Sequence, residues 1–170
     1  NKAAETGDLW QATFDGTPRS PVNYGGTYAS VSGIQVKYEV SSEQSYSGRF
    51  SGRITYTFGA NGYFLCSTPV LTGAPKAVPV SLSAWVMGDG SGNKLSLRIN
   101  DASDERWVVV VGPVNWTGWR RVEVSGLEKW THYLGDDNGV FDAPARTIHV
   151  DLGSVVGAPP SGVLYIDDIT

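Results

Sequence analysis

The sequence predicts an all-β protein, a sandwich of two β-sheets with about ten strands. Apolar and polar residues alternate in one segment after another, which is the period of a strand that buries one face. The 170 residues include 21 glycines and 9 prolines, and 18% are charged, a composition typical of a chain with many turns. Helical spacing is not convincing in any window, so we expect at most one helical turn.

The alternation is clearest in residues 94–101, where Leu95, Leu97 and Ile99 point to one face and the intervening residues to the other. The same period predicts strands at residues 32–40, 53–58, 80–87, 119–124 and 147–152. Shorter candidates are residues 9–15, 63–70, 106–111 and 163–169. Turn sequences rich in Gly and Pro separate these segments, and their even spacing predicts a single domain over residues 1–170.

Residues 128–145 form a long stretch without strand period, and the helical turn is expected near residues 127–134. The stretch carries Trp130, His132 and Tyr133. A loop longer than a simple connector is usually functional, so these rings are candidate binding residues.

Charge and composition exclude several classes of partner. The net charge is -4, and the only adjacent pair of basic residues is Arg120 and Arg121, so we expect no nucleic-acid surface. The longest apolar run, residues 107–111, is too short to span a bilayer, and residues 1–10 do not resemble a signal peptide. Cys66 is the single cysteine, which excludes an internal disulfide.

Catalytic signatures are weak. His132 and His149 are not spaced as metal ligands, and no nucleophile elbow or phosphate-binding loop occurs. Adjacent acids, such as Asp136 with Asp137, rarely reach the separation that glycoside hydrolysis needs. We therefore expect no catalytic residues.

The last strand ends in Asp167 and Asp168, so one of the two carboxylates points inward. A buried carboxylate needs compensation, either by a hard cation such as calcium or by backbone N–H groups. The residues alone leave both alternatives open.

Four motifs in order then suggest a family: FDG at 14–16, YSGRFSGRITY at 46–56, WTGWRRVEV at 116–124 and VLYIDDI at 163–169. Together they resemble carbohydrate-binding modules of the galactose-binding-like jelly-roll type, which includes families 4, 9, 16, 22 and 27. The resemblance implies a jelly roll of two antiparallel sheets. It also implies a structural calcium held by Asp15, by carbonyls around Ser45 and Ser47, and by Asp167 with Asp168 as fallback. Asp15 stands where many members have Glu.

The resemblance further implies a glycan site on a concave sheet formed by residues 32–40, 63–70, 94–101, 106–111 and 147–152. The polar faces of these segments present Arg98, Asn100, His149 and Asp151, with Gln35 and Lys37 toward one edge. We expect alanine substitutions on this floor to weaken binding with little change in stability. Trp107 is either a stacking platform or a core residue, and Trp130 and Tyr133 either wall the groove or pack over the sandwich.

The sequence therefore predicts a non-catalytic carbohydrate-binding module that binds a polysaccharide or oligosaccharide. By the resemblance, we expect a monomer attached to a glycan-active catalytic domain, secreted or extracellular and in some contexts attached to the cell surface. Two alternatives remain: a small jelly-roll lyase or hydrolase using His149, Arg98 and Asp151, and a cell-surface interaction or adhesion module.

Overall fold

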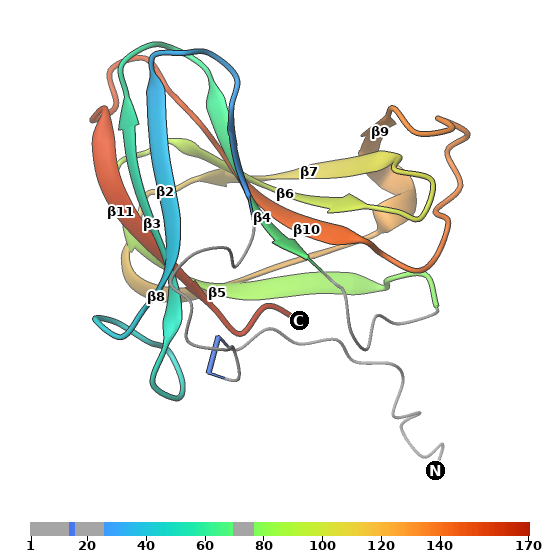
Figure 1. The fold of residues 1–170 in the computed structure, drawn as a ribbon, viewed down its shortest axis with the longest axis horizontal. Helices are drawn as coiled ribbons and strands as arrows, with labels where there is room; N and C mark the ends of the chain where they lie inside the picture. Colours follow the sequence, from blue (N-terminus) through green and yellow to red (C-terminus); the bar gives the residue numbers. More distant parts are fainter. Residues whose placement is uncertain (1–13, 16–25, 70–76) are drawn as a thin grey trace.

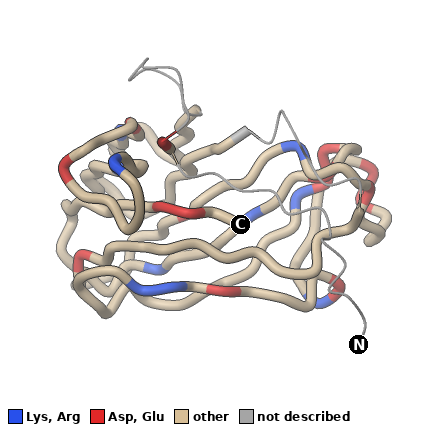
Figure 2. The backbone as a smooth tube through the Cα atoms, turned by 90° about the horizontal axis from the view of Figure 1, so that it is seen from below, with Lys and Arg blue, Asp and Glu red and all other residues tan. Residues whose placement is uncertain are grey.

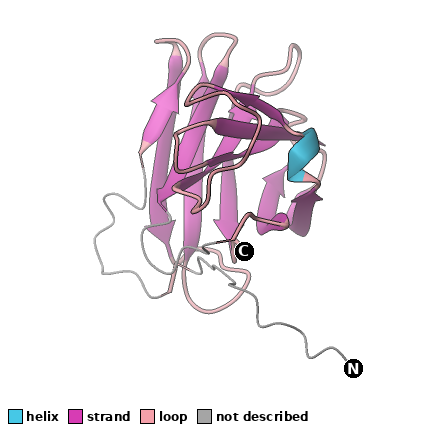
Figure 3. Cartoon of the chain, turned by 90° about the vertical axis from the view of Figure 1, so that its right-hand side faces the viewer, coloured by secondary structure: helices cyan, strands magenta, loops and turns pink. Residues whose placement is uncertain are grey.

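The computed structural model describes residues 14–15, 26–69 and 77–170. The strands form two antiparallel sheets that pack face to face on a shared core (Figure 1). The prediction of an all-β sandwich of the jelly-roll type is therefore confirmed. In the described part of the chain, the only helix is the 3₁₀ turn η1 (Leu127–Lys129), visible in Figure 3.

The larger sheet has six strands in the order β1-β4-β10-β6-β7-β9. Its strands are β1 (Thr27–Ala29), β4 (Tyr63–Pro69), β10 (Thr147–Gly153), β6 (Lys94–Asn100), β7 (Arg106–Pro113) and β9 (Thr131–Tyr133). The two central strands, β10 and β6, pair along their full length, whereas each edge strand has three residues. The centre of this sheet is thus its most extensively bonded part.

The smaller sheet has five strands in the order β2-β3-β11-β5-β8. Its strands are β2 (Ile34–Ser41), β3 (Ser51–Phe58), β11 (Ser161–Asp167), β5 (Ser81–Asp89) and β8 (Thr117–Ser125). β2 pairs with β3 in register from Ile34 opposite Phe58 to Ser41 opposite Ser51.

The core lies between the sheets, and alternate apolar residues of the strands point into it. Leu95, Leu97 and Ile99 of β6 face Ile54 and Leu164 of the other sheet in one buried cluster. Burial of such side chains contributes roughly 1.5–3 kcal/mol each. The alternation read from the sequence is therefore the alternation between core and outer face.

Most predicted strands are present, and the differences are local. Residues 9–13 and Val70 lie outside the described residues. The short strands β1 and β9 were not predicted, and β9 lies inside the stretch expected to be a loop. The expectation that residues 32–40 join the larger sheet is wrong, because β2 pairs with β3 in the smaller one.

Among the described residues, no helix is long and apolar enough to span a membrane.

Candidate functional site

The outer face of the six-stranded sheet, here called the groove face, carries polar side chains at its centre. Register places Arg98 of β6 opposite His149 of β10, Ser96 opposite Asp151 and Asn100 opposite Thr147. Because residues opposite each other in antiparallel strands share a face, the four predicted floor residues Arg98, Asn100, His149 and Asp151 lie together. The strands bring these predicted residues onto one surface.

An ion pair links the two central strands. Arg98 Nη2 lies 3.3 Å from Asp151 Oδ2, and the two side chains are only 6% and 13% exposed. Burial raises the pKa of the Asp151 carboxyl, while the Arg98 guanidinium acts in the opposite direction. The Arg98 guanidinium also lies over the Tyr133 ring, 5.5 Å from its centroid.

His149 is held as a neutral ring. Burial, with smaller contributions from Arg98 and Arg106, lowers its pKa from 6.5 to about 4. Its Nδ1 atom is 2.8 Å from Ser67 Oγ on β4. The ring is therefore oriented by the neighbouring strand and carries no charge at neutral pH.

Three buried polar atoms of this floor have no hydrogen-bond partner within the described ranges of the chain: Arg98 Nε, Asn100 Oδ1 and His149 Nε2. Native proteins satisfy nearly all such atoms, so a cluster of three on one face requires an explanation. The atoms supply a donor, an acceptor and a ring nitrogen that can serve as either.

Aromatic residues flank the polar floor. Tyr28 of β1 and Tyr63 of β4 lie at one end, 55% and 38% exposed, with ring centroids 6.3 Å apart. Half-buried Tyr133 of β9 lies at the other end, opposite Arg106. Trp130 is nearly buried there, and its Nε1 donates a hydrogen bond to the Ser125 carbonyl at 3.0 Å.

Two adjoining pockets hollow this surface. One of about 440 Å³ is lined by residues that include Tyr63, Ser96 and Asp151, and the other, of about 360 Å³, by residues that include Arg98, Trp130 and Tyr133. Both pockets share Val108 and Val110 of β7, so they adjoin on this face, and the two together are called the groove. A groove with aromatic ends and a polar floor suits a ligand with both apolar faces and hydroxyl groups.

The prediction that Trp107 offers a stacking platform is wrong. Its side chain is 2% exposed and belongs to the core, where Nε1 donates to Asp101 Oδ2 at 3.3 Å. Trp107 pairs with Ile99, a core residue of β6, so the pleat directs it inward.

The predicted place of Gln35 and Lys37 is also wrong. Both belong to β2 in the five-stranded sheet, and both are exposed there, away from the groove face.

The sequence reasoning missed Tyr28, Tyr63, Ser67 and Arg106. The alternation in residues 63–70 places Tyr63 and Ser67 on the outer face, so that signal was available. Tyr28 lies on a strand of three residues, which is too short to show a period.

The predicted metal ligands lie at the end of the sandwich where β11 ends. Asp167 Oδ2 accepts hydrogen bonds from the backbone N–H groups of Tyr46 and Ser47 at 2.9 and 3.2 Å, and Oδ1 accepts from that of Asp168 at 2.8 Å. Burial raises the pKa of Asp167, and these N–H groups oppose that shift. Asp167 is thus compensated by backbone N–H groups, one of the two alternatives that the sequence left open.

The neighbouring ligand candidates are partly engaged as well. Ser47 Oγ donates to Asp168 Oδ2 at 2.7 Å, and Ser45 Oγ donates to the Gly48 carbonyl at 3.2 Å. Asp15 Oδ1 accepts from the N–H groups of Arg49 and Phe50 at 2.6 and 3.0 Å. Asp168 Oδ1 is buried and has no hydrogen-bond partner among the residues that the structure describes.

Comparisons with known proteins identify the family of this chain. Residues 8–137 match the carbohydrate binding domain of family 11. A comparison with curated proteins gave no match.

Solved structures share the fold. A family 11 carbohydrate-binding module from Clostridium thermocellum, in complex with a β-1,3-1,4-mixed-linked tetrasaccharide, is 20% identical, with a TM-score of 0.62 over 85% of each chain. The CBM22-1 xylan-binding domain of Paenibacillus barcinonensis Xyn10C is 18% identical, with a TM-score of 0.53 over 98% of this chain and 95% of that one. The predicted resemblance to jelly-roll carbohydrate-binding modules is confirmed. Because the family match covers more than half of the sequence, the chain belongs to carbohydrate-binding domain family 11, and it is a non-catalytic carbohydrate-binding module.

Proposed function

We propose that the groove face binds a neutral β-glucan chain, which lies across β4, β10, β6 and β7. The observation that carries this proposal is the cluster of unpartnered atoms on β6 and β10 within the described part of the chain: Arg98 Nε, Asn100 Oδ1 and His149 Nε2. Sugar hydroxyls both donate and accept hydrogen bonds, so one bound residue can satisfy donors and acceptors together.

The aromatic ends supply the apolar part of recognition. Tyr28 and Tyr63 are exposed at one end of the groove, and Tyr133 lies at the other. Aromatic rings can pack on the apolar faces of pyranose rings while their hydroxyl groups stay in water. The sugar chain would therefore run from one aromatic end to the other over the polar floor.

The charges of the floor favour a neutral ligand. Arg98 is paired with Asp151, and His149 is uncharged at neutral pH because its pKa is about 4. Arg98 and His149 therefore offer no free positive charge to a polyanionic glycan, and the lysines that line the two pockets are the exposed Lys94 and Lys129. The tetrasaccharide bound by the Clostridium thermocellum module supports β-1,3-1,4-linked glucan as the first ligand to test.

The test is affinity electrophoresis in gels that contain mixed-linked β-glucan, xylan, galactan or polygalacturonate. We expect retardation by the mixed-linked glucan, none by polygalacturonate, and no release of reducing ends. Retardation should be reduced in Tyr63→Ala and kept in Tyr46→Ala, whose ring stacks on Trp85 of the other sheet. Unchanged retardation of Tyr63→Ala and Arg98→Ala would place the site elsewhere.

We also propose that the chain is a module of a secreted glycan-degrading protein, where it holds an attached catalytic domain on its substrate. Family membership supports this proposal. Detection of the full-length protein in culture medium, and loss of its activity on insoluble glucan after deletion of the module, would test it. We propose that the isolated module is a monomer, which size-exclusion chromatography would check.

We further propose a structural calcium ion. Asp168 Oδ1 is a buried carboxylate oxygen without a hydrogen-bond partner in the described ranges, and Asp15 and Asp167 lie around the same loop. Oxygen ligands of this kind suit calcium. The ion would join the loop at residues 45–50 to the end of β11 and would take no part in chemistry.

A further inference from the structure

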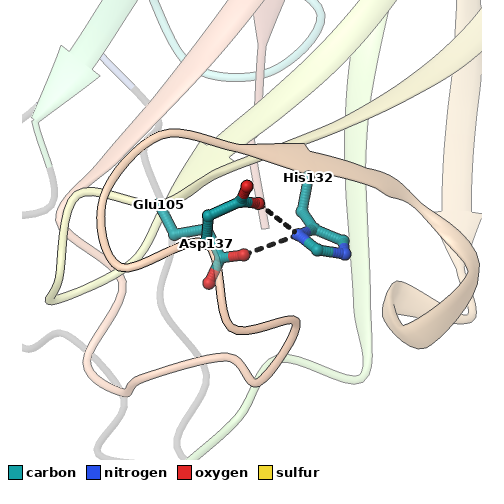
Figure 4. Close-up of side chains that lie close together, drawn as sticks. All are labelled: Glu105, His132 and Asp137. Carbon is teal, nitrogen blue, oxygen red and sulfur yellow. Dashed lines mark hydrogen bonds and ion pairs between the residues drawn. The ribbon is translucent and has the colours of Figure 1, made fainter.

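Two acidic loops meet beyond the ends of β6 and β9, away from the groove face. His132 Nδ1 lies 2.6 Å from Glu105 Oε1 and 3.1 Å from Asp137 Oδ1 (Figure 4). Across the residues that the structure describes, these three form the group of potential ligands whose atoms all lie within 4.8 Å of one another. We propose that Glu105, His132 and Asp137 bind a divalent first-row transition-metal ion, for which Zn²⁺ is the probe.

The negative charge around these three residues favours a bound cation. Residues 101–106 and 131–142 contain six acidic residues against one arginine and one histidine. Figure 2 shows several acidic segments close together at the right-hand end of the tube. Asp101 and Glu105 are the buried acids of this set, and hydrogen bonds from Glu105 N–H, Asp142 N–H and Trp107 Nε1 already compensate Asp101. Burying a carboxylate is costly unless a positive group or hydrogen bonds compensate it, so Glu105 is the acid for which a cation matters most.

Glu105 provides the second, independent observation. Its side chain is fully buried, and Oε1 accepts one further hydrogen bond, from the Gly139 N–H at 3.2 Å. The other oxygen, Oε2, is buried without a partner in the described part of the chain. A buried carboxylate held in this way, with Oε1 beside a histidine nitrogen and Oε2 unpartnered in the described ranges, is arranged as a metal ligand would be.

The geometry suits a metal that accepts both nitrogen and oxygen. One ring nitrogen faces two carboxylate oxygens, so a single imidazole proton occupies the position that a metal ion would take. Zn²⁺ binds His nitrogen and carboxylate oxygen at about 2.0–2.2 Å, which small side-chain rotations would reach. The imidazole ligand favours such an ion over calcium, which takes oxygen ligands. Asp137 is exposed, so solvent can supply a fourth ligand.

The backbone holds the two loops in place without the ion. Gly135 has a φ of +59°, and a Cβ at this position would lie 2.2 Å from the Glu105 nitrogen, so only glycine allows this approach. Asp101 links the same segments, because its carboxylate accepts hydrogen bonds from the backbone N–H groups of Glu105 at 3.0 Å and Asp142 at 3.1 Å. The ligands are therefore largely preorganised.

The test is calorimetric titration of chelator-treated, untagged protein with ZnCl₂ at pH 7.5, with excess CaCl₂ present so that the chain-end acids do not take up Zn²⁺. We expect one saturable site per chain. His132→Gln and Asp137→Asn should each weaken Zn²⁺ binding at least tenfold. Neither substitution removes a core residue, so both variants should fold. Asp136→Asn is the matched control, since its carboxylate contacts Ser103 and Asn138 instead, and it should keep wild-type affinity.

Co²⁺ in place of Zn²⁺ should give the visible absorption of a four-coordinate ion in wild-type protein and not in His132→Gln. The proposal is overturned by the absence of saturable binding, by wild-type affinity in either ligand variant, or by equal weakening in Asp136→Asn. In the first two cases the three residues are a hydrogen-bonded cluster only, and in the third the loop attracts cations without a defined site. Glucan retardation does not enter the test, so its outcome is separate from that of the groove.

Discussion

Arg98 and Asp151 form a buried ion pair diagonally across β6 and β10, with Nη2 3.3 Å from Oδ2. The same two side chains line the proposed glucan groove. If the proposed groove binds glucan, recognition and stability are linked at this pair. The expectation that alanine substitutions on the floor leave stability unchanged is not compatible with such burial, because loss of one partner leaves a buried charge.

Asp151→Ala should lower the free energy of unfolding by about 3 to 5 kcal/mol, since Arg98 would stay buried without its carboxylate. Urea titration at pH 7 measures this. The double variant Arg98→Met/Asp151→Leu should recover most of the loss, because an apolar pair removes both charges. That double variant should still fail to bind glucan. A stable double variant that binds glucan normally would show that Arg98 and Asp151 are not part of the binding site.

The pH dependence of stability should report on His149. Its pKa is about 4 in the folded protein, against 6.5 for an ordinary histidine. Between these values the unfolded chain binds a proton that the folded ring does not, so stability falls as pH decreases from 6.5 toward 4. The expected contribution is about 2 to 3 kcal/mol between pH 7.5 and 4.5.

His149→Gln should remove that contribution. Arg98 and Arg106 face the ring and lower its pKa, whereas Asp104 acts in the opposite direction, and all three remain in the variant. The raised pKa of Asp151 makes a contribution of opposite sign, which the two proteins share. Equal slopes of stability against pH in wild type and variant would mean that His149 titrates normally.

Tyr63→Ala should weaken glucan binding by roughly 1 kcal/mol or more, because an exposed ring is removed from one end of the groove. Its stability should stay within about 0.5 kcal/mol of wild type, since the side chain is exposed. Tyr63→Phe should bind almost normally, because stacking uses the ring. Calorimetry and thermal melts separate the two effects.

Trp107→Ala should destabilise the fold by about 3 to 5 kcal/mol, as expected for a large side chain removed from a core. At temperatures where the variant is still folded, it should retain glucan affinity. Chemical denaturation and affinity electrophoresis check this together. Selective loss of affinity with full stability would restore Trp107 as a binding platform.

If calcium binds beside Asp168, a chelator should lower the melting temperature, because a ligand bound only by the folded state adds to its stability. Asp168→Asn should abolish the response to chelator, and added CaCl₂ should no longer raise the melting temperature of the variant. Differential scanning fluorimetry measures both. An identical melting temperature of the wild-type protein with and without chelator would show that no stabilising calcium ion binds there.

The sequence predicted β6 and β10 well because every second residue of each strand is apolar and points into the core, so the strand period is visible in the sequence. For the same reason it placed Arg98 and His149 on a shared outer face. Trp107 was ambiguous, since residues 107–111 are all apolar and a continuous run does not show which face is buried. The strand that pairs with β2 could not be predicted either, because strand order depends on contacts between segments far apart in sequence.

The Glu105, His132 and Asp137 cluster illustrates the same limit. These residues are separated by up to 32 positions, and only the turn at Gly135 and the pairing of β9 with β7 bring them together. Their spacing matches no local metal motif, and the residue types alone could not distinguish ligands from solvated loop acids.

Tyr28 and Tyr133 are carried by β1 and β9, the two edge strands of the six-stranded sheet, and each of these strands has only three residues. An edge strand is hydrogen-bonded on one side, so it opens locally at a lower free energy than the strands in the middle. Backbone amides of β1 and β9 should therefore exchange with solvent faster than those of β6 and β10, and bound glucan should slow them. In the proposed complex, the centre of the groove would hold the glucan with a rigid geometry, whereas the two aromatic ends would adjust to bends between one glucose unit and the next.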